Sequence, residues 1–214
     1  NPRLPEAGDT PGFMKRMIDG GAVAIRTPVI FSALILVSLN SFFVRGILEI
    51  QPAIVGQIMG GKSYDLAIVT ASAGVGSLLA SGWIGLGRLE KSQIQKQLWP
   101  MLITGIMASA LLHFFASLTL VSLIFIVTGF TATIVGIGAQ TLIQLEVQEN
   151  YRARVMTWWS TISFGSLFLG GIVAGFLGDI VGMDQAILFM MLVAGTLALS
   201  VLPRIKALES SNPV

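Results

Sequence analysis

Six long apolar runs constrain the fold of this chain more than any other feature of its sequence. They cover about residues 29–50 (with an end near Met59 as the alternative), 65–87, 98–117, 119–144, 156–178 and 185–203. About 20 apolar residues in a helix cross the hydrocarbon core of a bilayer. Of the 214 residues, 54% are hydrophobic and only 11% charged, whereas about a quarter are charged in soluble domains. The sequence therefore predicts an all-α membrane protein with six transmembrane helices.

Basic residues predict the orientation of these helices. They recur before the first run, between the second and third, between the fourth and fifth, and after the sixth: Arg26, Arg88, Lys91, Arg152, Arg154 and Arg204. With six helices all of them fall on one side, which the positive-inside rule makes cytoplasmic. A five- or seven-helix count would break this alternation. We predict a multi-pass protein of the plasma (inner) membrane with both ends of the segment in the cytoplasm.

Three segments follow from this pattern. Residues 1–27 read as a cytoplasmic linker and amphipathic connector, because the first ten are rich in Pro, Gly and acidic residues. Residues 28–203 form the predicted six-helix bundle, and residues 204–214 a cytoplasmic tail. The bilayer itself is thus one predicted partner.

The first run carries two charges among its apolar residues. At 100° per residue, Ser38, Ser41, Arg45 and Glu49 share one helix face. Arg45 and Glu49 are four residues apart, so a regular helix brings the opposite charges together. Charged residues inside a membrane are costly and are candidates for function. A purely structural ion pair is the alternative.

Other faces are polar or small. The fourth run carries a stripe of Ser122, Gly129, Thr133, Gly136, Gln140 and Gln144, which predicts either a hydrogen-bonding wall or interhelical contacts. The second and fifth runs carry small residues at helical spacing, which predict close helix packing: Thr70, Ala73, Ser77 and Ser81, and Gly171, Gly175, Gly178 and Gly182.

Several classes of chemistry are disfavoured. The chain has no Cys and one His, His113, so neither a metal site nor a nucleophile with its base is expected. No phosphate-binding loop or metalloprotease motif occurs. The basic clusters are short and adjoin the apolar runs, so they indicate topology rather than nucleic-acid binding. We therefore expect no enzyme activity, no cofactor and no nucleic-acid partner.

Several stretches of the sequence resemble a known family of membrane proteins. Glu149-Asn150-Tyr151-Arg152-Ala153-Arg154-Val155-Met156 and the glycine-rich run after it resemble the loop and eleventh helix of major facilitator superfamily transporters, in their C-terminal half. Met17-Ile18-Asp19-Gly20-Gly21 and Arg26-Thr27-Pro28 resemble the connector into its seventh helix. Arg45-Gly46-Ile47-Leu48-Glu49-Ile50-Gln51-Pro52 is similar to that helix in the enterobactin-exporter-like and drug-efflux-like branch. The cytoplasmic signature after helix eight departs from the family, because Gly87 replaces its acidic residue.

The resemblance implies helices seven to twelve of a secondary transporter whose N-terminal six-helix half lies outside this chain. The first and fourth runs would then line a cavity for a small-molecule substrate: Ser38, Ser41, Arg45, Glu49, Thr133, Gln140 and Gln144. The second and fifth runs would meet the other half, and the third and sixth would face lipid. Glu49 is the candidate carrier of a coupling proton. Four basic residues would hold a cytoplasmic gate or only set topology: Arg88, Lys91, Arg152 and Arg154.

Three functional readings stay open at this point. The leading one is a proton-coupled exporter of a small amphiphilic molecule by alternating access. The second is a six-helix structural or assembly protein without transport, built on glycine contacts. The third is a self-dimerising half-transporter.

Overall fold

The protein is helical throughout the part that the structure describes. The computed structural model describes the backbone of residues 13–87 and 91–210 and the side chains of residues 18–87 and 91–203. The first membrane segment contains α2 (Pro28–Leu39), η1 (Asn40–Arg45), α3 (Gly46–Glu49), α4 (Gln51–Ala53) and η2 (Ile54–Ile58), and α1 (Phe13–Arg26) precedes it. The later elements are α5 (Ser63–Leu86), α6 (Lys91–Ala110), η3 (Leu111–His113), α7 (Leu118–Glu146), α8 (Glu149–Val181) and α9 (Met183–Ser210).

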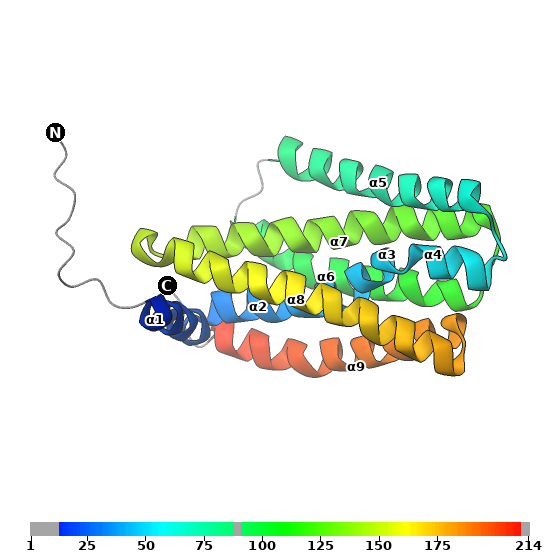
Figure 1. The fold of residues 1–214 in the computed structure, drawn as a ribbon. Coiled ribbons are helices and arrows are strands. Elements are labelled where there is room, and N and C mark those ends of the chain that lie inside the picture. Colours follow the sequence, from blue (N-terminus) through cyan, green and yellow to red (C-terminus); the bar gives the residue numbers. More distant parts are fainter. Residues whose placement is uncertain (1–12, 88–90, 211–214) are drawn as a thin grey trace, which may run out of the picture.

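The long helices lie side by side and alternate in direction, whereas α1 runs across one end of the bundle (Figure 1). The end of α5, the start of α6, the end of α7 and the start of α8 lie at the α1 end. The turns at 59–62 and 114–117 and at Gly182 lie at the opposite end. The basic residues before the first run and those of the α6 and α8 starts therefore share one end, as the charge pattern predicted.

Five helices among the described residues are long and apolar enough to cross a membrane: Pro28–Glu49, Ser63–Leu86, Leu118–Glu146, Glu149–Val181 and Met183–Pro203. Multi-pass membrane character is thus supported, but the six-helix count is met only in part. The exception is the third predicted span, 98–117. Its apolar residues are divided between the second half of α6, the short η3 and the non-helical residues 115–117, while α6 itself begins with the polar stretch 91–97.

Local chemistry explains where the helices begin and end. Pro28 opens α2, where its missing N–H costs nothing. Ser117 is extended, with φ −77° and ψ 138°, and so starts α7 after the turn. Gly182 has φ +94°, a conformation that L side chains rarely adopt, and it divides α8 from α9. The break predicted between the runs 98–117 and 119–144 is confirmed as a turn at residues 114–117.

The first membrane segment departs from a regular α-helix. Residues 40–45 and 54–58 are π-helical, and Ile50 has φ −96° and ψ 19° between α3 and α4. π-Helical turns inside α-helices are rare and are frequent at functional sites. The single helix predicted over 29–50 is therefore a helix in several pieces.

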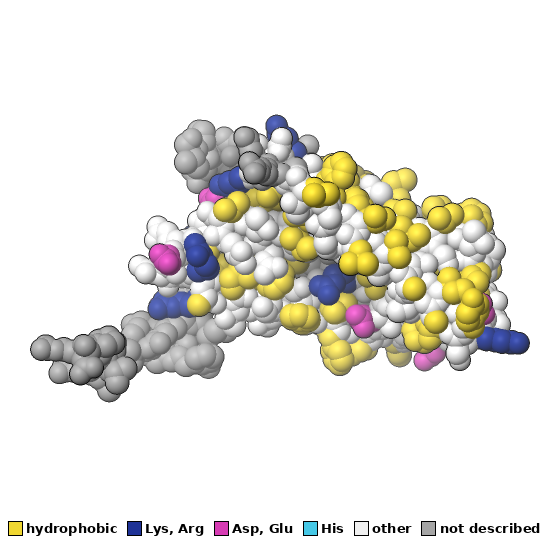
Figure 2. All heavy atoms as spheres, turned by 90° about the horizontal axis from the view of Figure 1, so that it is seen from above, with side chains coloured by type: hydrophobic (Ala, Val, Ile, Leu, Met, Phe, Trp, Pro, Cys, Tyr) yellow, Lys and Arg dark blue, Asp and Glu magenta, His cyan; other side chains and the backbone are white. Residues whose placement is uncertain are grey.

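Burial separates central from peripheral helices. In its most apolar stretch, the segment Pro28–Glu49 is 67% buried and α7 is 50% buried, against 22% for α5 and 17% for α8. Large apolar side chains consequently stand exposed on the two peripheral helices, including Leu78, Trp83, Phe164, Phe168 and Phe176. Hydrophobic side chains cover much of the face seen in Figure 2.

Candidate functional site

The polar face predicted on the first run lies against α8. Ser38 Oγ is 3.2 Å from Ser166 Oγ, and Ser41 Oγ is 3.3 Å from Ser163 Oγ. Arg45 Nη1 donates to Ser163 Oγ over 3.5 Å. These five residues, called the polar interface below, join α2 and η1 to the middle of α8. Ser163 and Ser166 were not singled out from the sequence, although their spacing of three places them on one helix face.

Arg45 and Glu49 do not form the ion pair that their spacing predicted. Among the described residues, ion pairs join Lys91 to Glu146 and His113 to Asp184. The π-helical stretch ends at Arg45 and residues 46–49 are α-helical, so the two charges are kept apart by the direction of the Arg45 side chain and not by the winding between them. The Arg45 side chain extends to Ser163 of α8, while Glu49 is exposed at the end of α3. The prediction of a paired charge is therefore wrong.

Glu49 lies at an apolar groove between α3 and α8. The groove has a volume of about 570 Å³ and is lined by Glu49, Ile50, Phe164, Leu167, Phe168, Gly171 and Ile172. A β-carbon built on Gly171 would touch Glu49 Cβ at 3.9 Å, so this glycine leaves the carboxylate side of the groove open. One carboxylate on an otherwise apolar wall suits an amphiphilic ligand with a polar or cationic group.

Asn40 is a buried polar residue that the sequence reading missed. It has no exposed surface; Nδ2 donates to the Ala132 carbonyl of α7 over 3.2 Å, and Oδ1 has no hydrogen-bond partner. An Asn inside an apolar run was a visible signal, but it falls beside the predicted stripe rather than on it. Its position at the start of η1 places an unsatisfied acceptor where the helix changes its winding.

The predicted α7 residues are separate from the polar interface. Thr133 and Gln140 are half-buried and Gln144 is exposed. Neither the Glu49 groove nor a second groove that includes Ser38 contains any of these three residues. Their participation in one cavity with Arg45 stays a prediction.

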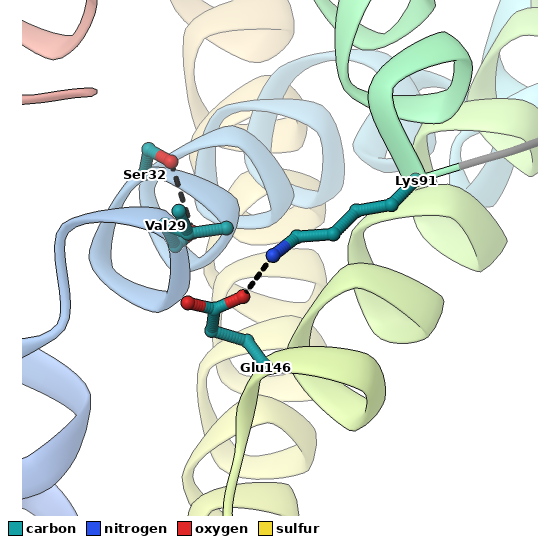
Figure 3. A network of polar contacts seen from close by, with 4 residues as sticks. All are labelled: Val29, Ser32, Lys91 and Glu146. Atoms are coloured by element: carbon teal, nitrogen blue, oxygen red, sulfur yellow. Dashed lines mark hydrogen bonds and ion pairs between the residues drawn. The ribbon is translucent and has the colours of Figure 1, made fainter. Parts of the chain in front are cut away.

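At the α1 end, Lys91 in the first turn of α6 is ion-paired with Glu146 in the last turn of α7 (Figure 3). Arg154 lies with its guanidinium carbon 5.5 Å from the centre of the Tyr151 ring, and Arg152 is exposed. Arg88 lies outside the described residues. The Lys91 ion pair fixes the ends of two helices, which is a structural role compatible with a gate.

Small residues produce two close helix contacts. A β-carbon on Gly76 of α5 would lie 2.0 Å from the carbonyl oxygen of Ile126, and one on Gly129 of α7 would lie 2.3 Å from that of Ala73. The predicted packing role of Ala73 and Ser77 is confirmed, since Ser77 Oγ also donates to the Gly129 carbonyl over 3.4 Å.

On α8 the close backbone contact involves Gly170, which is not in the predicted glycine stripe; within the stripe, a β-carbon on Gly178 would lie 2.5 Å from Met183 Cε. A β-carbon on Gly170 would lie 2.0 Å from the Phe42 carbonyl oxygen, whereas one on Gly175 would meet open space. The sequence contains adjacent glycines here, about 100° apart on the helix, and spacing alone does not select between them.

His113 Nδ1 lies 3.4 Å from Asp184 Oδ2 at the end opposite α1, without a hydrogen bond. The contact ties η3 to the first turn of α9. No group of three or more metal-ligating side chains occurs among the described residues.

Comparison of the chain with protein-family models, with curated proteins and with solved structures gave no match. The major facilitator resemblance therefore stays a prediction drawn from short motifs, and the site rests on geometry alone.

Proposed function

We propose that this chain is the C-terminal six-helix half of a secondary transporter that moves a small amphiphilic molecule by alternating access. In this proposal α2 to α4 and α7 face the central cavity, and α5 and α8 meet the N-terminal half. The third span, α6, and the sixth, α9, face lipid. The α1 end is cytoplasmic in the plasma membrane, as the basic residues favour.

The observation that carries the proposal is the irregular first membrane segment. It contains two π-helical stretches and polar residues at mid-length, among them the buried Asn40 and the half-buried Arg45. Transporters bind their substrates near the bilayer midplane at helices whose regular winding is interrupted. A purely structural bundle gains nothing from an unsatisfied Asn40 oxygen and a charged side chain held only by a hydroxyl.

Arg45 and Glu49 have different roles in this mechanism. Arg45 is held by Ser163, so it is positioned to bind the polar part of a substrate. Glu49 lies apart at an apolar groove, where a carboxylate is suited to exchange a proton as the cavity opens to either side. Basic and acidic side chains occur in the middle of the face shown in Figure 2, among hydrophobic ones. The two charges thus act at separate points, Arg45 at Ser163 and Glu49 at the apolar groove.

A structural or assembly role is the second candidate, and the glycine contacts favour it. The approach of α5 to α7 through Gly76 and Gly129 is close on both sides and leaves no room for a β-carbon. Such a contact is typical of static helix packing. It leaves the polar interface unexplained, which is why transport is preferred.

Transport in proteoliposomes tests the proposal. The full-length protein is reconstituted, a proton gradient is imposed, and accumulation of a panel of labelled amphiphilic compounds is followed for wild type, Glu49→Gln and Glu149→Gln. Glu149 is exposed in the first turn of α8 and serves as the matched control. We expect Glu49→Gln to lose gradient-driven accumulation while it retains exchange of substrate across the membrane, and Glu149→Gln to behave as wild type.

Two outcomes contradict the proposal at different levels. If Glu49→Gln accumulates substrate as wild type does, Glu49 does not carry the coupling proton. If wild type moves no compound under any gradient, the assembly role replaces transport.

A further inference from the structure

A second groove lies at the α1 end of the bundle, away from Glu49. It is formed by α1, α2 and α8, has a volume of about 550 Å³, and has Gly21, Ile25, Ser38, Trp158, Gly165 and Leu169 among its lining residues. Its polar lining atoms are few, and the hydroxyls of Ser38 and Ser166 are already hydrogen-bonded to each other. The groove is therefore a site for an apolar chain.

The length of the groove matches one leaflet of a bilayer. On α8 its lining extends from Trp158 to Leu169, which corresponds to about 17 Å along a helix. Half of a hydrocarbon core of about 30 Å is about 15 Å. Ile25 and Leu169 at its rim are 67% and 55% exposed, so the groove is open along its side. An acyl chain, rather than a compact solute, fits these dimensions.

Two arginines adjoin groove-lining residues along α1 and α8. Arg26 follows Ile25 and is exposed, and Arg154 precedes Trp158 by one turn of α8. A β-carbon on Gly20, next to Gly21, would lie 2.7 Å from Arg154 Cβ, which fixes Arg154 beside α1. Asp19 and Glu149 are on the same helices, but neither lines the groove and neither forms an ion pair with these arginines.

We propose that the groove between α1, α2 and α8 binds an anionic phospholipid, with one acyl chain between α2 and α8 and the phosphate at Arg26 and Arg154. Charge complementarity selects this occupant over a neutral lipid, because basic pockets beside membrane helices bind anionic headgroups. The helix α1 lies across the bundle end (Figure 1), as an interfacial helix does, and its exposed Ile18 and Ile25 suit that position. The proposal requires a membrane location but no transport activity.

Native mass spectrometry of the purified full-length protein tests this site. The protein is incubated with equal amounts of phosphatidylglycerol and phosphatidylcholine of the same chain length, and the retained lipid is counted. Gly165→Leu fills the groove, and Gly175→Leu is its matched control, because a β-carbon meets open space at both positions and only Gly165 lines the groove. Thr161→Trp, from another lining position, is a second filling variant.

Wild type and Gly175→Leu are expected to retain phosphatidylglycerol in preference, whereas Gly165→Leu and Thr161→Trp retain neither lipid. Arg154→Gln is expected to lower the preference about fivefold, the change that corresponds to about 1 kcal/mol per basic residue near an anionic surface. Lys62→Gln, at the opposite end of the bundle, leaves it unchanged.

Equal retention of the two lipids by wild type would overturn the proposal, and so would filling variants that hold phosphatidylglycerol as wild type does. Displacement of the lipid by inorganic phosphate alone would show a simple anion site instead. None of these readouts depends on flux, so the site and the transport function fail separately.

Discussion

Two helix contacts in this bundle each place a glycine against a backbone carbonyl, but their surroundings differ. Gly76 of α5 faces the Ile126 carbonyl of α7, and Gly170 of α8 faces the Phe42 carbonyl of η1; in each case a β-carbon would lie 2.0 Å from the oxygen. The α5–α7 contact joins two regular α-helices. The α8–η1 contact adjoins the polar interface and a π-helical segment.

The backbone that opposes the glycine determines whether a close contact is rigid or adaptable. Between α5 and α7 the fit is tight in both directions, because a β-carbon on Gly129 would lie 2.3 Å from the Ala73 carbonyl oxygen, whereas one on Gly46, which opposes Gly170, would lie 3.2 Å from the Gly170 backbone. Neither backbone can retreat without separating the other pair. On the other side of the bundle, Phe42 belongs to a segment with wider winding, which has room to return to regular α-helix. We therefore expect the α5–α7 contact to be structural and the α8–η1 contact to be the one that changes during function.

The largest expected effect is that of Gly76→Ala. The new methyl group meets backbone atoms of Ile126 and Phe130 that belong to a regular helix, so overpacking is expected to cost about 3 kcal/mol. Thermal unfolding of the purified protein, followed by tryptophan fluorescence, measures it. Gly74→Ala is the control on the same helix, since its β-carbon meets open space. Equal melting temperatures of the two variants would contradict the rigid contact.

A smaller loss is expected for Gly170→Ala, about 1–2 kcal/mol. The clash distance is the same as at Gly76, but the opposing carbonyl of Phe42 lies within η1, which can shift. Gly175→Ala on the same helix is the control, and the same fluorescence melt is the measurement. If Gly170→Ala loses as much stability as Gly76→Ala, the contrast between an adaptable and a rigid contact is broken.

Much of this arrangement could be predicted from the sequence, because the length of an apolar run and the charge of a loop are local properties of the chain. The helices near 65–87, 119–144, 156–178 and 185–203 were predicted, and so was the turn before α7. The third span was less well predicted. Its apolar run continues past the end of α6 through η3 into residues 114–117, and an apolar run does not reveal where a helix stops.

Only part of the candidate site could be predicted from the sequence, for a related reason. Ser38, Ser41 and Arg45 share a polar face in the sequence, and all three contact α8. Their partners Ser163 and Ser166 lie more than 100 residues away, in a run whose glycines drew attention instead. Helical spacing alone also produced the wrong ion pair, because the Arg45 side chain extends to Ser163 of α8 rather than to Glu49, and that direction depends on tertiary packing rather than on a local motif.

The smallest expected effects are those of single hydroxyl deletions, and they separate the two contacts most finely. Ser163→Ala removes contacts of 3.3 Å to Ser41 and 3.5 Å to Arg45, which are long, so about 0.6 kcal/mol is expected, the average for hydrogen bonds between membrane helices. Ser77→Ala should cost less. One of the two hydrogen bonds of Ser77, to the Ala73 carbonyl at 3.1 Å, lies within α5 and does not join α5 to α7.

A double-mutant cycle tests whether Ser163 and Arg45 interact with each other. Ser163→Ala and Arg45→Met share a contact, so their effects on stability should be non-additive, by part of the ~0.6 kcal/mol that Ser163→Ala costs. Ser163→Ala and Ser77→Ala belong to different contacts and should add. Additive effects of Ser163→Ala and Arg45→Met would mean that the hydroxyl does not hold the guanidinium.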